Sequence, residues 1–416
     1  MNDILKGDHI LWIVFITLCS ISLIEVFSAA STLSYKSGDH LAPITAHCIT
    51  LGIGAVCVYI FHLCPYKYFR LIPYFLLPLS WLLLLMVMAM GIFADERVNG
   101  ASRWIFGFQP SEMAKGCLVV TVAYILSRYQ TEKACSSLAF KPILLVTALT
   151  LLFIAPENGS TALLLAVVIY MMMIIGRIPG RQIGKLTVGV LLAGGLMVTL
   201  VMTVPPSVYQ DVPGTHRFVT WRNRINEFIN PEVVPASAYD VDRKAQKAHA
   251  NIAIATSHVL GKGPGNSIQR DHLSHSYSDY IYAIVIEELG LLGGAFVVLL
   301  YIIIIFRVGY IAKRTDDNFA CLLVIGLGLL LVTQAMMHMF VTVGLFPVTG
   351  QPLPLISKGG SSIFFNSIYI GIILSVSRTI EEQQSASLPD SSVPSDSRAT
   401  DGTEQNGSGT AQPDMD

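Results

Sequence analysis

The chain has 416 residues, of which 53% are hydrophobic and 13% are charged, and its formal net charge is −1. This composition indicates an integral membrane protein with several spans, and it gives no reason to expect nucleic-acid binding. The seven cysteines are scattered without a CxxC pair, so we interpret them as packing residues and not as metal ligands or disulfides.

Runs of about 20 apolar residues, the length needed to cross a bilayer, recur along the chain. The first run lacks the cleavage site of a signal peptide, so we interpret it as a membrane helix. The sequence therefore predicts an all-α polytopic membrane protein, in which the short fifth and sixth runs form a tight hairpin. The ten runs lie near residues 9–31, 43–63, 71–93, 111–128, 141–156, 160–176, 183–205, 279–307, 319–346 and 354–378.

Lysine and arginine mark alternate short loops, and short loops rich in these residues stay in the cytoplasm. This pattern places both termini in the cytoplasm and a long segment, about 206–278, on the outer side. Within that segment we expect a helix from about Asp240 to Leu260. The basic loops carry Lys67, Arg70, Arg128, Lys133, Lys141, Arg177, Arg181, Lys185, Arg307, Lys313 and Arg314.

The last part of the chain, residues 381–416, has a different composition. It is rich in Ser, Asp, Gln, Gly and Pro, and Arg398 is its only basic residue. Such a segment cannot bury enough apolar surface to order itself. We therefore expect a membrane domain over residues 1–380, followed by a disordered cytoplasmic tail.

The first polar cluster covers residues 99–116 on the outer side. A Pro-Ser pair there is typical of a helix start, with Ser111 able to cap the helix. Glu112 and Lys115 are three residues apart and can pair on one helix face. Two interpretations stay open, namely a structural ion pair at a helix entrance, or Arg103 and Lys115 facing an external anionic ligand.

A second cluster, APENGSTA at 155–162, places Glu157 in the turn between the fifth and sixth runs. A solvated turn carboxylate and a functional carboxylate are equally compatible with this position.

The third cluster is the stretch from Gly261 to Gly290. Its glycine-rich start, GKGPGNS, lacks the spacing of a P-loop, but a constrained turn of this kind exposes backbone N–H groups that could hold an anion. By helical periodicity Asp279 shares a face with Ala283, Ile286, Glu287 and Gly290. The helix dipole alone could explain Asp279, but not Glu287 and Glu288 deeper in the apolar run, where a charge costs about 2.5 to 3.5 kcal/mol.

The fourth cluster is VTGQPLPLISKGGSS at 348–362. Its glycines and prolines predict irregular backbone near membrane depth, which is tolerated where it lines a cavity or is buried in protein. Lys358 is a further candidate for contact with an anion.

All four clusters are expected on the outer side, where they combine one carboxylate, Asp279, with Arg103, Lys115, Lys358 and Arg270. Hydrolysis of a sugar bond normally uses two carboxylates, one of which protonates the leaving oxygen. A diphosphate leaving group needs cations and no proton, so a single general base with several cations suits glycosyl transfer from a lipid diphosphate.

The order and spacing of these blocks resemble the SEDS family (shape, elongation, division, sporulation) of peptidoglycan polymerases, over nearly the whole chain up to about Arg378. The matching blocks are NGASRWI, QPSEMAK, GKGPGNSIQ, SYSDYIYAIVIEELG and PVTGQPLPLISKGGSS. The resemblance implies that Asp279 is the catalytic base for the acceptor sugar's hydroxyl. It also implies substrate-binding roles for Arg103, Glu112, Lys115, Glu157, Asn266, Gln269, Ser357, Lys358, Gly359, Gly360 and Ser361.

Three positions depart from the family's pattern. Its His-Thr-Asp-Phe block reads Tyr-Ser-Asp-Tyr at 277–280, its Pro-Asp-x-Gly block contains Glu157 here, and Lys358 replaces a frequent tyrosine. The second departure puts any role of Glu157 in doubt, although the charge is kept.

The resemblance implies an inverting glycosyltransferase that polymerises lipid II into glycan strands at the outer face of the bacterial inner membrane. Its division branch is more similar to this chain than its elongation branch. Arg103, Lys115 and Lys358 would stabilise the undecaprenyl diphosphate that is released, and a divalent cation, Mg²⁺ or Mn²⁺, could assist them. The implied partners are a class B penicillin-binding transpeptidase, other division proteins, lipid II and undecaprenyl-linked glycan, and the membrane.

Two alternatives stay open. A transporter, either a lipid II flippase or a solute carrier, could use Asp279 as a proton site, although the sequence has no inverted repeat and its polar residues gather on one side. A scaffold that only recruits the transpeptidase is the second alternative, and it predicts that Asp279 is dispensable.

Overall fold

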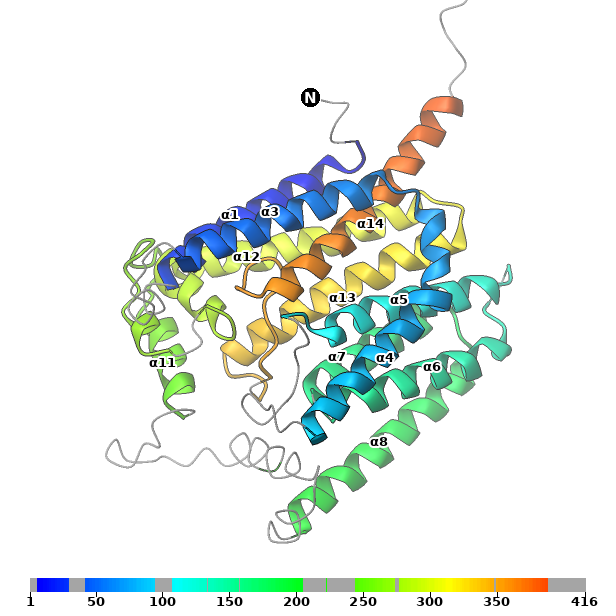
Figure 1. Cartoon of the computed structure of the whole chain (residues 1–416), viewed down its shortest axis with the longest axis horizontal. Coiled ribbons are helices and arrows are strands. Elements are labelled where there is room, and N and C mark those ends of the chain that lie inside the picture. The colour runs from blue at the N-terminus through cyan, green and yellow to red at the C-terminus, as the bar shows by residue number, and fades with distance from the viewer. Residues whose placement is uncertain are drawn as a thin grey trace, which may run out of the picture.

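The computed structural model (Figure 1) consists of helices that follow the apolar runs of the sequence. It describes residues 6–29, 42–93, 107–132, 134–156, 158–204, 222, 244–273, 277–347 and 349–387. The long helices are α1 (His9–Ala29), α3 (Ala42–Leu63), α4 (Ile72–Phe93), α5 (Pro110–Arg128), α6 (Phe140–Ile154), α7 (Gly159–Ile175), α8 (Gly180–Thr203), α12 (Ile281–Lys313), α13 (Asn318–Thr342) and α14 (Gly360–Ser387).

The prediction of a polytopic membrane protein is confirmed. Within the described residues, eight helices are long and apolar enough to cross a membrane, namely α1, α3, α4, α6, α8, α12, α13 and α14. Of the other two predicted spans, α7 has 17 residues and is shorter than the bilayer requires, and α5 begins with a polar turn. The predicted hairpin between α6 and α7 is also observed, because only residues 155–158 separate them.

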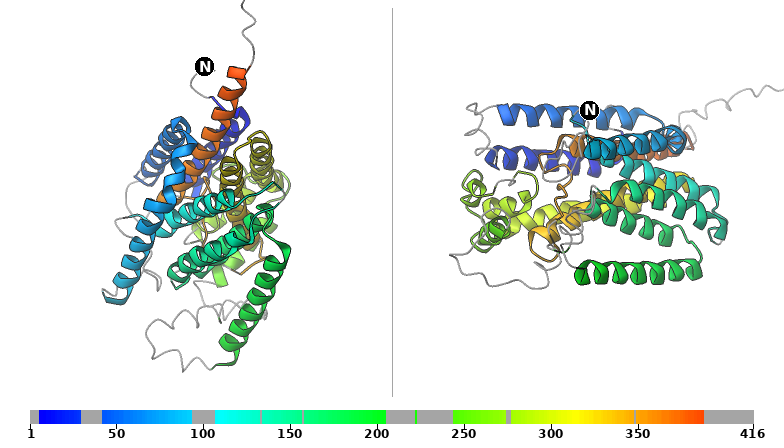
Figure 2. Two further views of the ribbon diagram at one scale, coloured as in Figure 1. Left: turned by 90° about the vertical axis from the view of Figure 1, so that its right-hand side faces the viewer. Right: turned by 60° about the horizontal axis from the view of Figure 1, so that its bottom comes forward.

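Helices α5, α13 and α14 form the interior of the bundle. Helix α14 packs on α3, α13 packs on α5, α7 and α12, and α1 packs along α12. Helix α8 lies at the edge, where it contacts α7, as two views show (Figures 1 and 2). Val201 is its one buried residue, so α8 presents almost its whole apolar surface outward.

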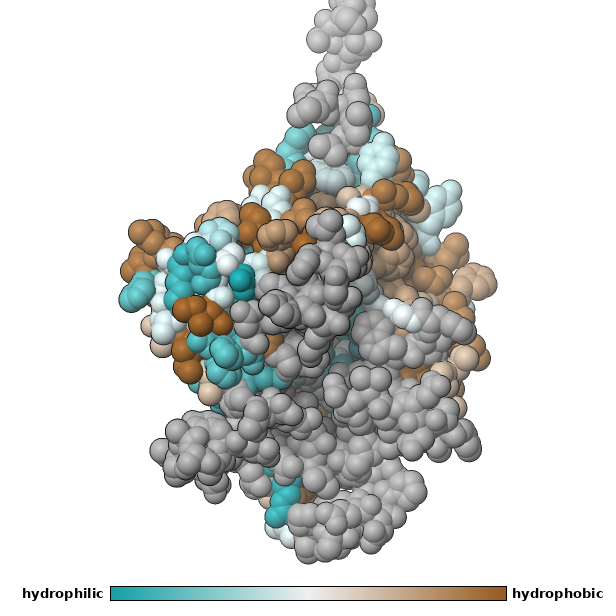
Figure 3. All heavy atoms as spheres, turned by 60° about the vertical axis from the view of Figure 1, so that its left-hand side comes forward, coloured by the Kyte–Doolittle hydropathy of each residue, from teal (hydrophilic) through white to brown (hydrophobic). Residues whose placement is uncertain are grey.

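The two ends of the bundle differ in their chemistry. At one end Arg307 pairs with Asp8, Arg70 pairs with Asp317, and the Gly7 N–H donates to Glu381. This end holds the beginning of α1, the last turns of α14 and the basic loops, so both described ends of the chain lie on the same side (Figure 1). The opposite end carries α11 (Lys244–Ala255) and the predicted site, and hydrophilic side chains gather there (Figure 3).

Helix α12 is interrupted close to that second end. Gly290 has φ 75° and ψ −177°, a conformation essentially restricted to glycine. The short segment before it, from Ile281, is therefore offset from the long part that crosses the membrane. The sequence gives no sign of this break, because the apolar run continues through Gly290.

Three predicted boundaries are wrong. The last apolar run was expected from residue 354, but α14 begins at Gly360, because the preceding Pro-Leu-Pro-Leu stretch is buried as irregular chain. The predicted tail begins at 381, whereas α14 continues to Ser387, and the rest of the tail lies outside the described residues. The outer helix ends at Ala255 and not near Leu260, and the start expected at Asp240 lies outside the described residues.

Candidate active site

The centre of the candidate site is the irregular segment from 349 to 359, which we call the end-block loop. It connects α13 to α14, and most of its residues are buried, with hydrogen bonds to α1, α7, α12 and α13. Gln351 donates to Thr161 Oγ1 at 2.7 Å, and Ser160 donates to the Thr349 carbonyl at 2.9 Å, so α7 anchors its beginning. The expectation that this irregular backbone is buried in protein is confirmed.

The end-block loop holds the turn that carries Asp279. Ser357 Oγ donates to the Ser278 carbonyl at 2.8 Å, and the Lys358 N–H donates to the Tyr277 carbonyl at 2.9 Å. The same Ser357 oxygen accepts from the Leu353 N–H at 2.8 Å, so it joins the loop to the turn. Two segments about 80 residues apart in the sequence are thereby fixed to each other.

Asp279 is half-buried in this turn. Its Oδ1 accepts a hydrogen bond from Ser278 Oγ at 2.7 Å, and its Oδ2 lies beside Gly350, where an added Cβ would be 3.6 Å away. Helix α12 begins at Ile281, with Tyr280 as its N-cap. The predicted helical face shared by Asp279, Glu287 and Gly290 is therefore wrong, because Asp279 precedes the helix.

Lys358 lies on the same side as Asp279. Its Nζ is 5.4 Å from the centre of the Tyr277 ring, a distance that favours a cation–π contact. Burial lowers the pKa of Lys358 below its usual value of 10.5. Burial, and secondarily the charge of Asp279, raises the pKa of Tyr277 above 10.0. The Lys358 ammonium thus lies near a phenol that stays neutral at ordinary pH.

The position of Lys115 differs from one of the two interpretations of the sequence, in which Lys115 faces an external anionic ligand. Its side chain is fully buried, and its Nζ lies 2.8 Å from Glu112 Oε1 and 2.8 Å from Gln334 Oε1. The structural ion pair is therefore what is observed, and Lys115 does not face the outer surface. The second Glu112 oxygen, Oε2, is buried and has no hydrogen-bond partner among the described residues.

The beginning of α5 joins the same site. Pro110 is its first residue and Gln109 is its N-cap, so the predicted capping by Ser111 is wrong, and Ser111 Oγ instead accepts from Gln109 Nε2 at 3.1 Å. Ser361 Oγ, in the first turn of α14, accepts from the Gln109 N–H at 3.1 Å. Gly359 and Gly360 lead directly into that turn. Arg103 and Glu157 lie outside the described residues.

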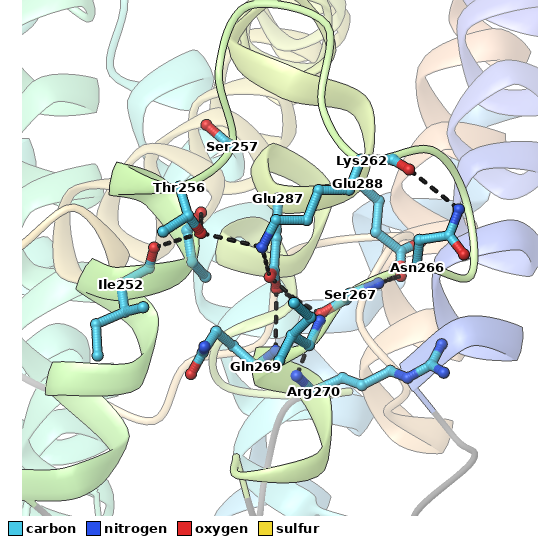
Figure 4. Close-up of polar contacts among 12 residues, drawn as sticks. Ile252, Thr256, Ser257, Lys262, Asn266, Ser267, Gln269, Arg270, Glu287 and Glu288 are labelled. Carbon is cyan, nitrogen blue, oxygen red and sulfur yellow. Dashed lines mark hydrogen bonds and ion pairs between the residues drawn. The ribbon is translucent and has the colours of Figure 1, made fainter.

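The glycine-rich stretch forms a separate cluster, which we call the outer clamp (Figure 4). It consists of the loop 258–270 and of Glu287 and Glu288 on α12. Glu287 accepts from Lys262 Nζ, Ser267 Oγ and the N–H groups of Ile268 and Gln269. Glu288 accepts from the N–H groups of Gly265 and Ser267, and from Ser28 on α1.

The outer clamp uses the donors that the sequence suggested for an external anion. The N–H groups of Lys262 and Gly263 donate to the carbonyls of Glu287 and Glu288, so the loop also caps the interrupted helix. Asn266 Nδ2 donates to the Lys262 carbonyl, and Gln269 Oε1 lies 2.7 Å from His249 Nδ1. Arg270 donates to Ser28 and the Gly265 carbonyl, within this cluster. Substrate binding by Asn266 and Gln269 stays a prediction.

Sequence reasoning missed two polar residues on α13, Gln334 and His338. Both are buried, four residues apart on one helix face, and both contact the end-block loop. Polar residues within an apolar run are a signal of function, which could have identified them.

A metal site is not evident from the side chains. Among the described residues, no three His, Cys, Asp or Glu side chains gather closely enough to hold a metal ion.

Known proteins resemble the chain over most of its length. The family model FTSW_RODA_SPOVE, described as "Cell cycle protein", matches residues 8–382. A probable peptidoglycan glycosyltransferase FtsW of Trichlorobacter lovleyi is 30% identical over 89% of this chain and 93% of its own length. The protein of the same description from Nitrosomonas europaea is 32% identical over 79% of each chain.

Two solved structures share the fold. One belongs to a study titled "Structural coordination of polymerization and crosslinking by a peptidoglycan synthase complex" and has a TM-score of 0.67, 20% identity and coverage of 90% of this chain and 98% of the other. The rod shape determining protein RodA of Thermus thermophilus has a TM-score of 0.61 and 19% identity, with coverage of 91% and 98%.

Proposed function

The chain belongs to the FtsW/RodA/SpoVE family of cell cycle proteins, and from this premise we propose that it is a peptidoglycan glycosyltransferase that polymerises lipid II for cell division. The observation that supports this most is the similarity to curated relatives described as probable peptidoglycan glycosyltransferases FtsW, along almost the whole of both chains. The SEDS resemblance noted in the sequence agrees with this membership.

Asp279 is the general base of the proposed reaction. It takes the proton of the acceptor sugar's hydroxyl while that oxygen bonds to the anomeric carbon of the donor. The bond from that carbon to the diphosphate oxygen breaks, and its electron pair leaves with the undecaprenyl diphosphate. Asp279 is half-buried and oriented by Ser278, so it is accessible and yet held in place.

The leaving diphosphate needs positive charge and no proton. Lys358 is the described cation that lies beside the Asp279 turn, and we assign it this role. Lys115 can contribute only if Glu112 or Gln334 releases it, because both now bind its ammonium group. Arg103 is proposed as a further cation from its position in the sequence.

The same proposal implies how the enzyme is oriented in the membrane and which partners it binds. The site end of the bundle faces outward across the bacterial inner membrane, and both termini are cytoplasmic, since the basic loops gather at the other end. A class B penicillin-binding transpeptidase is the proposed partner, together with other division proteins. If a divalent cation takes part, oxygens of the diphosphate would complete its coordination, because Asp279 belongs to no group of three or more His, Cys, Asp or Glu side chains in the part of the chain that the structure describes.

The test is lipid II polymerisation in liposomes with the partner transpeptidase present, comparing the wild type with Asp279→Asn. General-base catalysis typically contributes about 10²- to 10⁴-fold, so strand synthesis should fall by that factor. Asp316→Asn is the matched control, since Asp316 is an exposed carboxylate at the opposite end of the bundle. It should polymerise at the wild-type rate.

Other outcomes separate the alternatives. Equal synthesis by wild type and Asp279→Asn would show that the assignment of the base is wrong. Transfer of lipid II across the bilayer without strand synthesis would favour a flippase. Recruitment of the transpeptidase without either activity would favour a scaffold.

A further inference from the structure

Two side chains of α13 bind the backbone of the end-block loop at successive carbonyls. His338 Nδ1 is 2.7 Å from the Gln351 oxygen, and Gln334 Nε2 donates to the Pro352 oxygen at 3.1 Å. Both side chains are buried, with relative exposures of 1% and 0%, so solvent cannot replace these bonds. A buried hydrogen bond of this kind fixes its two partners in position.

The partners define how each side chain is oriented. A carbonyl oxygen only accepts, so His338 carries its proton on Nδ1 when the ring is neutral. Gln334 faces a carbonyl on one side and the Lys115 ammonium on the other, so its nitrogen must point to Pro352 and its oxygen to Lys115. Gln334 therefore links Lys115 directly to the loop.

The same stretch of loop touches the general base. Asp279 Oδ2 lies against Gly350, the residue before the carbonyl that His338 holds. Helix α13 thus contacts Lys115 on one side and, through two adjacent carbonyls, the segment on which Asp279 rests.

We propose that Gln334 and His338 are positioning residues of the glycosyl transfer, which set the place of Asp279 relative to the Glu112–Lys115 pair. They do so by holding the Gln351 and Pro352 carbonyls, and neither needs to touch substrate. This inference depends on the proposed function. A displacement of about 1 Å at a reacting group can cost on the order of 10²-fold in rate, so loss of either bond should lower kcat.

Three substitutions at His338 test the geometry. The amide nitrogen of Asn is as many bonds from Cβ as His338 Nδ1, so His338→Asn can still donate to Gln351. The amide nitrogen of Gln is one bond further and corresponds to Nε2, which has no partner among the described residues. His338→Leu has no donor.

The expected result is a difference between these variants in strand synthesis. His338→Asn should keep kcat within about threefold, whereas His338→Gln and His338→Leu should lose about 10- to 100-fold with an unchanged KM for lipid II. Gln334→Leu should behave like His338→Leu. Thr342→Val is the matched control and should keep full activity, because the Thr342 hydroxyl bonds to the His338 carbonyl of its own helix and does not reach the loop.

Amide hydrogen exchange gives a second readout that needs no activity. Peptides over residues 349–359 and 277–280 should exchange faster in His338→Leu and His338→Gln than in the wild type, and His338→Asn should restore protection. The inference is overturned if His338→Asn is as impaired as His338→Leu in both measurements, or if no variant differs from the wild type. If the wild type makes no strands, the proposed function fails, and the exchange pattern still decides whether α13 positions the loop.

Discussion

The outer clamp and the end-block loop contain the same kinds of residue, but these residues have different roles in the two regions. Each combines glycines, serines and a lysine with carboxylates at the outer end of the bundle. In the outer clamp the carboxylates of Glu287 and Glu288 accept seven donors from Ser28, the loop and Lys262. The clamp is therefore closed on itself and has the character of a scaffold.

Around the end-block loop several polar atoms remain unsatisfied. Glu112 Oε2, His338 Nε2 and Gln351 Oε1 are buried and have no hydrogen-bond partner among the described residues. Buried polar groups are normally paired, so several unpaired groups close to one loop indicate that a ligand, water or a second conformation satisfies them. The comparison teaches that the density of polar residues does not identify a substrate site, because the carboxylates of Glu287 and Glu288 are fully used within the protein, whereas Glu112, His338 and Gln351 each keep a buried atom without a described partner.

The largest expected effect concerns the outer clamp and is the loss of the fold in Gly290→Ala. A Cβ there would lie 2.2 Å from the Val259 carbonyl oxygen and 2.4 Å from the Gly261 nitrogen, and φ is 75°. We expect a cost of at least about 4 kcal/mol, seen as loss of folded protein in thermal unfolding of purified material.

Gly350→Ala is the matched control in the end-block loop. Gly350 also has a positive φ, 65°, but the nearest atom to an added Cβ is 3.6 Å away. Only backbone strain of roughly 1 to 2 kcal/mol is expected, so this variant should fold. Equal stability of the two variants would contradict the close approach of the clamp to α12.

Much of this architecture could be predicted from the sequence, because apolar runs and turn residues are local signals. The interruption at Gly290 could not, since it depends on backbone contacts with Val259 and Gly261, about 30 residues earlier. Asp279, Ser357 and Lys358 were predicted and lie together. The closed state of the clamp was missed, because a sequence cannot tell whether a carboxylate or an external anion fills a ring of N–H groups.

The second prediction separates stability from activity within the clamp. Glu287→Gln removes a buried charge that accepts four donors, so the free energy of unfolding should fall by about 3 kcal/mol. Lys262→Gln should cost less, because the Lys262 side chain is 23% exposed and Glu287 keeps its other donors. Denaturant titration in detergent measures both.

Measuring strand synthesis by the same variants extends this second prediction from stability to activity. Each folded molecule of Glu287→Gln or Lys262→Gln should polymerise lipid II nearly as fast as the wild type, because Glu287 and Lys262 bond to each other and Glu287 bonds to the rest of the loop. A kcat as low as that of Asp279→Asn, at a temperature where the variant is folded, would show that the clamp belongs to the reacting site.

The third prediction is a pH effect at Lys358. Burial lowers its pKa, so the ammonium that binds the diphosphate is lost at a lower pH than in an ordinary lysine. Above that pKa, kcat/KM should fall up to tenfold per pH unit. Arginine keeps its charge at these pH values, so Lys358→Arg should move the alkaline decline upward. Identical alkaline profiles would remove Lys358 from the binding of the leaving group.

The smallest effect is expected at Glu25, on α1 beside the clamp. Its side chain is fully buried, and neither carboxylate oxygen has a hydrogen-bond partner among the described residues. An unpaired charge is costly to bury, so Glu25 gains nothing from ionisation there. Glu25→Gln keeps the shape without the charge, and its unfolding free energy should stay within about 0.5 kcal/mol of the wild type.

Ser28→Ala, one turn further along α1, provides the contrast for Glu25. Its hydroxyl donates to Glu288 and accepts from Arg270, so its loss leaves two partners of the clamp short of a bond. The cost should be about 1 to 3 kcal/mol by thermal or denaturant unfolding. If Glu25→Gln proved the more damaging of the two, Glu25 would hold a donor in the folded protein, and the clamp would be an open site like the end-block loop.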